Sequence, residues 1–192
     1  MSTRPKLISG PIDHFIELDA VKAALRLRHV EQDDYIETLI SAATGRLDGP
    51  EGALGRCIMP QTWSSQESMT FAGSYRLPLV DVRSVAIKYF DTAGVETVLP
   101  DTEYQLKEGR GQSVVVFNED FEMPDTYEDR NEFTFEMTAG LPDASPKIKT
   151  VATAAMMMIV QWYRAPDGMT EDRGEIPAGV THLIRDLKVT RV

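Results

Sequence analysis

Apolar residues recur at helical spacing near the start of the chain. A short helix is predicted from Ala20 to about Arg28, with Asp19 as its N-cap. A longer helix is predicted from about Gln32 to Leu47, because apolar residues recur three and four positions apart. That stripe consists of Tyr35, Ile36, Leu39, Ile40, Ala43 and Leu47. The residues before Pro11 show no such pattern, and we expect them to be irregular.

The most apolar segment is SPKIKTVATAAMMMIVQWYR, from Ser145 to Arg164. Ser145 is a suitable N-cap, and Pro146 suits the first helical turn. A transmembrane helix needs about 18–20 consecutive apolar residues. The apolar run in this segment is shorter, because lysines precede it and a glutamine interrupts it. The segment therefore predicts a soluble helix with apolar residues on more than one face. Such a helix either lies in the core of one domain or also packs on a neighbouring copy, through Met156, Met157, Met158, Trp162 and Tyr163.

Between these helices the pattern changes to a period of two. Val85, Ile87 and Tyr89 alternate with smaller or polar residues, as in a half-buried strand. The DTAG sequence from Asp91 to Gly94 predicts a hairpin loop, and Val95–Leu99 its partner strand. Further strands are expected at Tyr104–Lys107, Ser113–Phe117 and Phe133–Thr138. Together these signals predict an all-β module of roughly six short strands.

The order of these elements predicts an α+β protein. The N-terminal helices fall in residues 1–56, the β module in 57–143, the long helix in 144–166, and a linker with a C-terminal arm in 167–192. This order indicates a small helical bundle, two N-terminal helices plus one long C-terminal helix, with the β module inserted. The alternative is a single α+β domain with its helices on one face of a sheet.

Composition narrows the possible functions. The chain has 192 residues and a net charge of −10, whereas proteins that grip DNA phosphates are usually basic. This charge argues against DNA binding, although not against a protein that DNA slides past. Cys57 is the single cysteine, which rules out an intrachain disulfide and fits a reducing compartment. The N-terminus lacks the apolar core of a signal peptide, so we expect the chain in the cytoplasm or in a particle assembled there.

An acidic stretch, NEDFEMPDTYEDRNE, runs from Asn118 to Glu132. It is either a solvated loop or an acidic surface that faces DNA without holding it, because like charges repel within about a Debye length of roughly 8 Å. The candidates to line such a channel are Glu119, Asp120, Glu122, Asp125, Glu128 and Asp129.

The C-terminal segment IPAGVTHLIRDLKVTRV, Ile176 to Val192, is both apolar and basic. Its apolar content is poorly explained by disorder. It is either the last element of its own domain or an arm that docks into another protein. The candidate docking residues are Ile176, Val180, Leu183, Ile184, Arg185, Leu187, Lys188, Val189 and Arg191.

The sequence offers no catalytic or metal-binding constellation. The histidines His14, His29 and His182 lie far apart, and one cysteine cannot complete a zinc site. Glu31, Asp33 and Asp34 fit the role of helix-start charges better than that of metal ligands. We therefore expect no catalytic residues, no metal and no cofactor.

The order and spacing of several pieces carry a further signal. LDAVKAALRL, DDYIETLISAATGRL and CIMPQTW precede YRLPLVDVRSVAIKYFDTAGVETVL and EYQL, and FTFEMTAGLP and SPKIKTVATAAMMMIVQWYR follow. The most telling piece is LP-x-x-x-V-x-S-V-x-x-x-Y before a D-x-x-G hairpin, from Leu77 to Gly94. Together they resemble the head–tail connector, or adaptor, proteins of long-tailed phages and of phage-derived gene transfer agents.

This resemblance implies a structural protein and not an enzyme. Such adaptors form a ring, usually of twelve copies, beneath the portal of a filled head, in the neck of a virion or phage-like particle assembled in the bacterial cytoplasm. The implied partners are further copies of the chain, the portal, the next neck protein and DNA that passes without sequence-specific binding. No membrane is involved.

Family C-terminal segments commonly reach into the portal, so the resemblance assigns Ile176–Val192 as the docking arm. Family tails often end in an aromatic–arginine pair, whereas this chain ends in VTRV.

Two alternatives remain open. A β module with an acidic loop is also compatible with a carbohydrate-binding or hydrolytic domain, whose aromatic platform would come from Trp63, Tyr75, Tyr89 and Tyr104. Another neck component, such as the stopper, is the second alternative.

Overall fold

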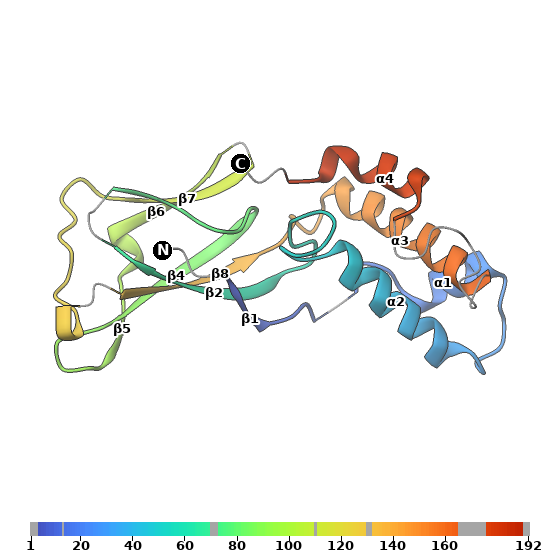
Figure 1. Cartoon of the computed structure of the whole chain (residues 1–192), viewed down its shortest axis with the longest axis horizontal. Coiled ribbons are helices and arrows are strands. Elements are labelled where there is room, and N and C mark those ends of the chain that lie inside the picture. Colours follow the sequence, from blue (N-terminus) through green and yellow to red (C-terminus); the bar gives the residue numbers. More distant parts are fainter. Residues whose placement is uncertain are drawn as a thin grey trace. The chain divides into compact units, whose positions relative to one another are not determined.

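The chain forms two compact units in the computed structural model, which describes residues 4–12, 14–69, 73–109, 111–129, 132–164 and 176–189 (Figure 1). One unit, here called the β unit, comprises Met1–Pro11 and Pro60–Gly140. The other, the helical unit, comprises Ile12–Met59 and Leu141–Val192. Across the described residues there are four α-helices and two antiparallel sheets, which confirms the α+β class.

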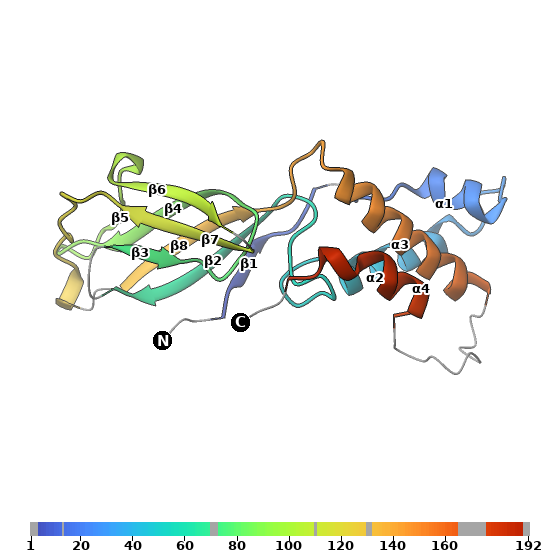
Figure 2. The ribbon, with the colours of Figure 1, turned by 90° about the horizontal axis from the view of Figure 1, so that it is seen from above.

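The helical unit contains α1 (Leu18–Leu25), α2 (Asp33–Leu47), α3 (Pro146–Arg164) and α4 (Ala178–Ile184). Helix α3 contacts each of the other three helices, as Figure 2 shows from a second direction. Its predicted start is confirmed, since the Lys147 backbone N–H donates to Ser145 Oγ over 3.4 Å. None of the described helices is long and apolar enough to cross a membrane. The buried residues of α3 are Val151, Ala154, Ala155, Met158 and Ile159.

Helix α1 differs from its predicted bounds at both ends. Glu17 holds the N-cap position, so Asp19 lies inside the first turn. Arg26 ends the helix in the left-handed conformation (φ 60°), and the Leu27 N–H returns to the Lys22 carbonyl over 2.9 Å. This closing turn stops the helix before Arg28, a feature that apolar spacing alone does not indicate.

The β unit contains eight strands among the described residues. Their bounds are β1 (Lys6–Ser9), β2 (Gln61–Ser68), β3 (Ser74–Arg76), β4 (Val82–Phe90), β5 (Glu96–Val98), β6 (Tyr104–Gly109), β7 (Gln112–Phe117) and β8 (Glu132–Ala139). One sheet has the order β1-β2-β8-β4-β5 and the other β3-β7-β6, with every neighbouring pair antiparallel. In Figure 1, β6 and β7 lie on one side of β4, β8 and β2.

Strand β8 forms the centre of the larger sheet. Its side chains alternate between buried and half-buried, with Phe133, Phe135 and Met137 turned inward. The Tyr75 ring from the smaller sheet stacks on Phe135 with a centroid distance of 5.0 Å. The Tyr104 hydroxyl donates to the Val85 carbonyl over 2.9 Å, which joins the two sheets again. The unit is therefore a sandwich with one apolar interior.

The segment before Pro11 is not irregular, contrary to expectation, because it supplies strand β1. Leu7 pairs with Trp63 and Lys6 with Ser64 on β2. Both apolar side chains of this strand, Leu7 and Ile8, are exposed, so no alternation of buried and exposed residues marks it in the sequence. Pairing with β2, not its own pattern, makes it a strand.

Candidate interaction surfaces

The acidic stretch lies between β7 and β8 and is fastened to the end of the β unit. Phe121 is buried and stacks on Phe117 with a centroid distance of 4.6 Å. Asn118 donates from Nδ2 to the Thr102 carbonyl over 2.6 Å and from its backbone N–H to Glu103 over 3.0 Å. This segment, residues 118–129, is therefore an anchored loop with its acidic side chains turned outward.

The acidic candidates are exposed to solvent wherever the structure describes their side chains. They are Glu119, Asp120, Glu122, Asp125 and Glu128. The side chain of Asp129 lies outside the described residues. Together these five carboxylates form a negatively charged surface on the β unit, although their role as a channel lining stays a prediction.

The tip of the neighbouring hairpin lies against this loop. Asp91 Oδ1 accepts from the backbone N–H groups of Ala93 (2.9 Å) and Val95 (3.0 Å), which closes the predicted DTAG turn. Gly94 has a φ of 77°, and a β-carbon at this position would lie 3.5 Å from Tyr127 Cδ2. The turn therefore requires glycine for its conformation and leaves room for the Tyr127 ring.

The C-terminal segment folds on its own unit in this structure. Helix α4 and the 3₁₀ turn Arg185–Leu187 bury Val180, Ile184 and Leu187 among the core residues of the helical unit. The Val189 N–H donates to the Leu54 carbonyl over 2.9 Å. Of the candidate docking residues, Leu183, Arg185 and Lys188 are exposed, and Arg191 lies outside the described residues.

The residues expected to pack on a neighbouring copy divide between the core and the surface. Met158 is buried, whereas Met156, Trp162 and Tyr163 are partly buried against the same core. Met157 is 43% exposed, although its Cε lies close to Gly179 of α4. Packing of this helix on a second copy stays a prediction, for which Met157 is the most accessible of the five.

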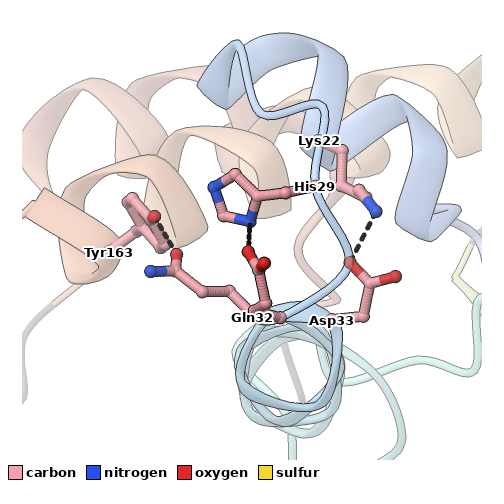
Figure 3. Close-up of polar contacts among 6 residues, drawn as sticks. Lys22, His29, Gln32, Asp33 and Tyr163 are labelled. Atoms are coloured by element: carbon pink, nitrogen blue, oxygen red, sulfur yellow. Dashed lines mark hydrogen bonds and ion pairs between the residues drawn. The ribbon is translucent and has the colours of Figure 1, made fainter.

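Polar side chains join the first three helices, as Figure 3 shows. Lys22 Nζ lies 2.6 Å from Asp33 Oδ1, and His29 Nδ1 lies 2.9 Å from Glu31 Oε2. The Tyr163 hydroxyl donates to Gln32 Oε1. Asp33 at the start of α2 therefore serves a contact with α1, whereas the His29–Glu31 pair lies within the loop between these two helices. In the described part of the chain, no three His, Cys, Asp or Glu side chains gather closely enough to hold a metal ion.

Two open hollows flank the segment Phe15–Leu18 in the helical unit. One of about 540 Å³ is lined by His14, Glu37 and Ile40 among others, and one of about 370 Å³ by Ala20, Ala152 and Met156 among others. This segment carries no periodic signal in the sequence that would have indicated these hollows. Neither hollow contains a constellation of catalytic groups.

The aromatic residues that a sugar platform would need face the interior of the β unit or pack at its margin. The Tyr75 ring lies on Phe135, and the Tyr89 ring lies 5.7 Å from Phe133. Tyr104 is buried, and its burial, followed by the nearby Asp101 carboxylate, raises its pKa. Trp63 Nε1 donates to Gln61 Oε1 over 3.3 Å. These contacts use the rings for packing, as half-buried strands do.

Comparison with known structures finds similar folds in chains of gene transfer agent particles. No protein-family model and no curated protein matches the chain. A chain in the neck of an empty gene transfer agent particle, solved with C6 symmetry, is 19% identical with a TM-score of 0.68. A chain in the neck of the native particle, solved with C12 symmetry, is 18% identical with a TM-score of 0.67. A chain in the virion of the native particle is 18% identical with a TM-score of 0.64.

Each of these matches covers 99% of this chain and 97% of the other chain. At such low identity, the likeness shows a shared fold along the whole chain. It confirms, at the level of the fold, the resemblance to connector proteins of gene transfer agents that the sequence pieces indicated.

Proposed function

We propose that this chain is a structural subunit of the neck of a phage-like particle. More specifically, it is an adaptor that forms a ring of about twelve copies below the portal and extends the DNA channel toward the next neck protein. The observation that carries this proposal is the likeness, over almost the full length of both chains, to chains in gene transfer agent necks. A subunit of this kind needs surfaces for copies of itself and for other proteins, and no catalytic site.

The rotational symmetry of those necks supports the ring. A particle solved with C12 or C6 symmetry contains repeated copies of its parts around one axis. A ring also multiplies weak contacts, because each copy that binds raises the effective concentration of the others. On this proposal the chain functions in the neck of a particle assembled in the bacterial cytoplasm.

The portal contact is proposed to lie on the C-terminal segment. This segment is folded in the free chain, and of its candidate docking residues Leu183, Arg185 and Lys188 are exposed and accessible to a partner. The positive charges of Arg185 and Lys188 are opposite in sign to the net charge of the whole chain, which is −10. A stopper or other neck component remains the second candidate, since the same fold similarity supports any neck role.

The test is the mass of complexes that the purified chain forms with purified portal rings and with filled heads. We expect stoichiometric binding by the chain and its loss in Arg185→Glu/Lys188→Glu. Truncation before Ile176 is a poorer test, since it removes Val180 and Ile184 from the core. The matched control is Lys147→Glu/Lys149→Glu, which reverses two exposed charges on α3.

Three outcomes are informative. Loss of binding in the C-terminal variant alone supports both the adaptor and its docking segment. Binding by all variants preserves the adaptor and removes the docking segment. No binding of the unmodified chain to the portal, even on filled heads, overturns the adaptor in favour of another neck component.

A further inference from the structure

The five-stranded sheet of the β unit ends in two different edges. Strand β1 is paired on one side with β2, and strand β5 on one side with β4. Among the described residues, no strand pairs with the outer side of either one. Each edge therefore presents backbone N–H and C=O groups that can pair with a further strand.

Both edges also expose large apolar side chains. Leu7 and Ile8 on β1, and Phe90, Val95 and Val98 at β5 and its hairpin, have exposed fractions between 46% and 58%. Proteins usually protect an edge with short strands, charge or proline, since an apolar edge favours association. Here the strands are short, but the side chains beside them are those of a contact surface.

The charges of the two edges are opposite. Lys6 lies on β1, with Arg4 just before it, and both are exposed. Glu96 lies on β5 and Asp101 follows it, and both are exposed. The nearby cation Lys88 already pairs with Glu136, with 2.6 Å between Nζ and Oε2. The β5 edge is thus acidic and the β1 edge basic.

We propose that these are complementary docking edges, so that β1 of one copy of this chain adds beside β5 of a second copy. This inference rests on the proposed ring, because a closed ring of more than two copies needs two different, mutually complementary patches on each subunit. Four antiparallel steps separate β1 from β5, so the two strands run in the same direction. Rotation about a ring axis that runs along the strands keeps the strand direction. Strand β1 of one copy therefore pairs in parallel with β5 of the next copy.

The short strands set the strength of this contact. Strand β1 has four residues and β5 has three, so each junction provides few hydrogen bonds. Single junctions are weak, and the free chain is expected to be monomeric at micromolar concentration. Closure of the ring on a portal then adds the junctions together.

The test uses thiol crosslinking between Ser9→Cys on β1 and Thr97→Cys on β5. Cys57 is buried, with 1% of its surface exposed, and so does not compete for the reagent. The Ser9→Cys and Thr97→Cys chains, each of which keeps the buried Cys57, are mixed at several hundred micromolar and, separately, assembled on portal rings, then treated with a short bis-maleimide. We expect the Ser9–Thr97 heterodimer in clear excess over both homodimers, and a ladder beyond dimers from the double variant.

Charge reversal at the two edges provides a second test of the pairing. Lys6→Glu or Glu96→Lys alone is expected to lower the heterodimer yield roughly two- to fivefold, and the two reversals combined to restore it. The matched control replaces Thr97→Cys by Glu108→Cys on the exposed part of β6, which belongs to the other sheet and should give no excess.

A heterodimer yield no greater than that of the two homodimers combined, or no heterodimer in either setting, overturns the edge pairing. Crosslinking of Ser9 only to another neck protein overturns it as well. Portal binding by the untreated chain is measured in parallel. If the chain binds the portal but gives no heterodimer, the edge pairing is refuted and the adaptor function stands. If it gives the heterodimer but does not bind the portal, the portal adaptor is refuted and the edge pairing stands.

Discussion

At the scale of single residues, the most unusual position is Glu67 on β2. It is only 4% exposed, it lies within the sandwich, and its Oε1 has no hydrogen-bond partner in the described structure. The Tyr75 hydroxyl donates to its carboxylate. Buried carboxylates are costly unless they are hydrogen-bonded, so this single donor carries much of the compensation.

Tyr75→Phe should therefore destabilise the β unit by about 1–3 kcal/mol at neutral pH, because it leaves the Glu67 carboxylate without that donor. The double variant Tyr75→Phe/Glu67→Leu should recover part of the loss. Denaturant unfolding measures both. A Tyr75→Phe variant as stable as the unmodified chain would contradict this account of the pair.

Alkaline pH gives an independent readout of the same pair. Burial, then the hydrogen bond and the charge of Glu67, raise the pKa of Tyr75 above its usual value of 10.0. Above pH 10 the unfolded chain therefore releases a proton that the folded chain keeps, so the free energy of unfolding falls as pH rises. The contribution of one such group is about 1.4 kcal/mol per pH unit.

Tyr75→Phe should reduce that alkaline slope by about one proton, as measured by unfolding between pH 9 and pH 11. An unchanged slope would mean that Tyr75 ionises equally in both states.

The buried contact between Glu67 and Tyr75 cannot be predicted from the residue types alone. The β2 sequence QTWSSQES reads as polar, yet Gln61, Ser65 and Glu67 are buried. Strand β2 pairs with the apolar β8 throughout its length, and this partner determines which β2 residues are enclosed. A period-two pattern in one strand carries no information about its neighbour.

At the scale of elements, helix α3 offers a matched pair of adjacent methionines. Met158 is 1% exposed and Met157 is 43% exposed. Met158→Ala should lower the free energy of unfolding of the helical unit by about 2–5 kcal/mol, since it leaves a cavity. Met157→Ala should cost less, about 1 kcal/mol, because this side chain is partly solvent-exposed and its removal leaves no enclosed cavity.

The two tryptophans allow this measurement to be made in one unit at a time. Trp63 belongs to the β unit and Trp162 to the helical unit. In a Trp63→Phe background, fluorescence reports the helical unit. Equal destabilisation by the two methionine changes would contradict the observed orientation of α3.

Elements with a repeating apolar pattern or a turn signal could be predicted from the sequence, and those that depend on a distant partner could not. Helices α2 and α3 and strands β7 and β8 each bury a repeating set of residues, so their patterns are visible. Strand β1 and the end of α1 depend on a partner strand and on the left-handed Arg26. The fold of the C-terminal segment, which the sequence left open, depends on contacts with α3 and on the hydrogen bond from Val189 to the distant Leu54.

At the scale of the whole molecule, we expect the acidic surface of the loop at residues 118–129 to keep the chain from binding DNA. Reversal of Glu119, Asp120 and Glu122 to lysine should create salt-dependent binding to double-stranded DNA that the unmodified chain lacks. In assembled particles the same variant should slow DNA release. Fluorescence anisotropy and particle DNA release measure the two effects.

The control reverses Asp19, Asp34 and Glu37, three exposed acidic residues of the helical unit, to lysine. It changes the net charge equally. If this control slows DNA release as much as the loop variant does, the loop has no special position along the DNA path.

The pairing of Gln61 with Ala139 has a consequence for how the chain folds. The inserted part of the β unit begins at Pro60 and ends at Gly140, so its first and last strands bring both ends of the insertion together. Once that sheet has formed, α2 and α3 are joined by what amounts to a short connection, and the entropy of closing a long loop has already been lost. Early folding of the β unit would therefore speed the assembly of the helices. Any slowing of β2–β8 pairing would delay the folding of both units together.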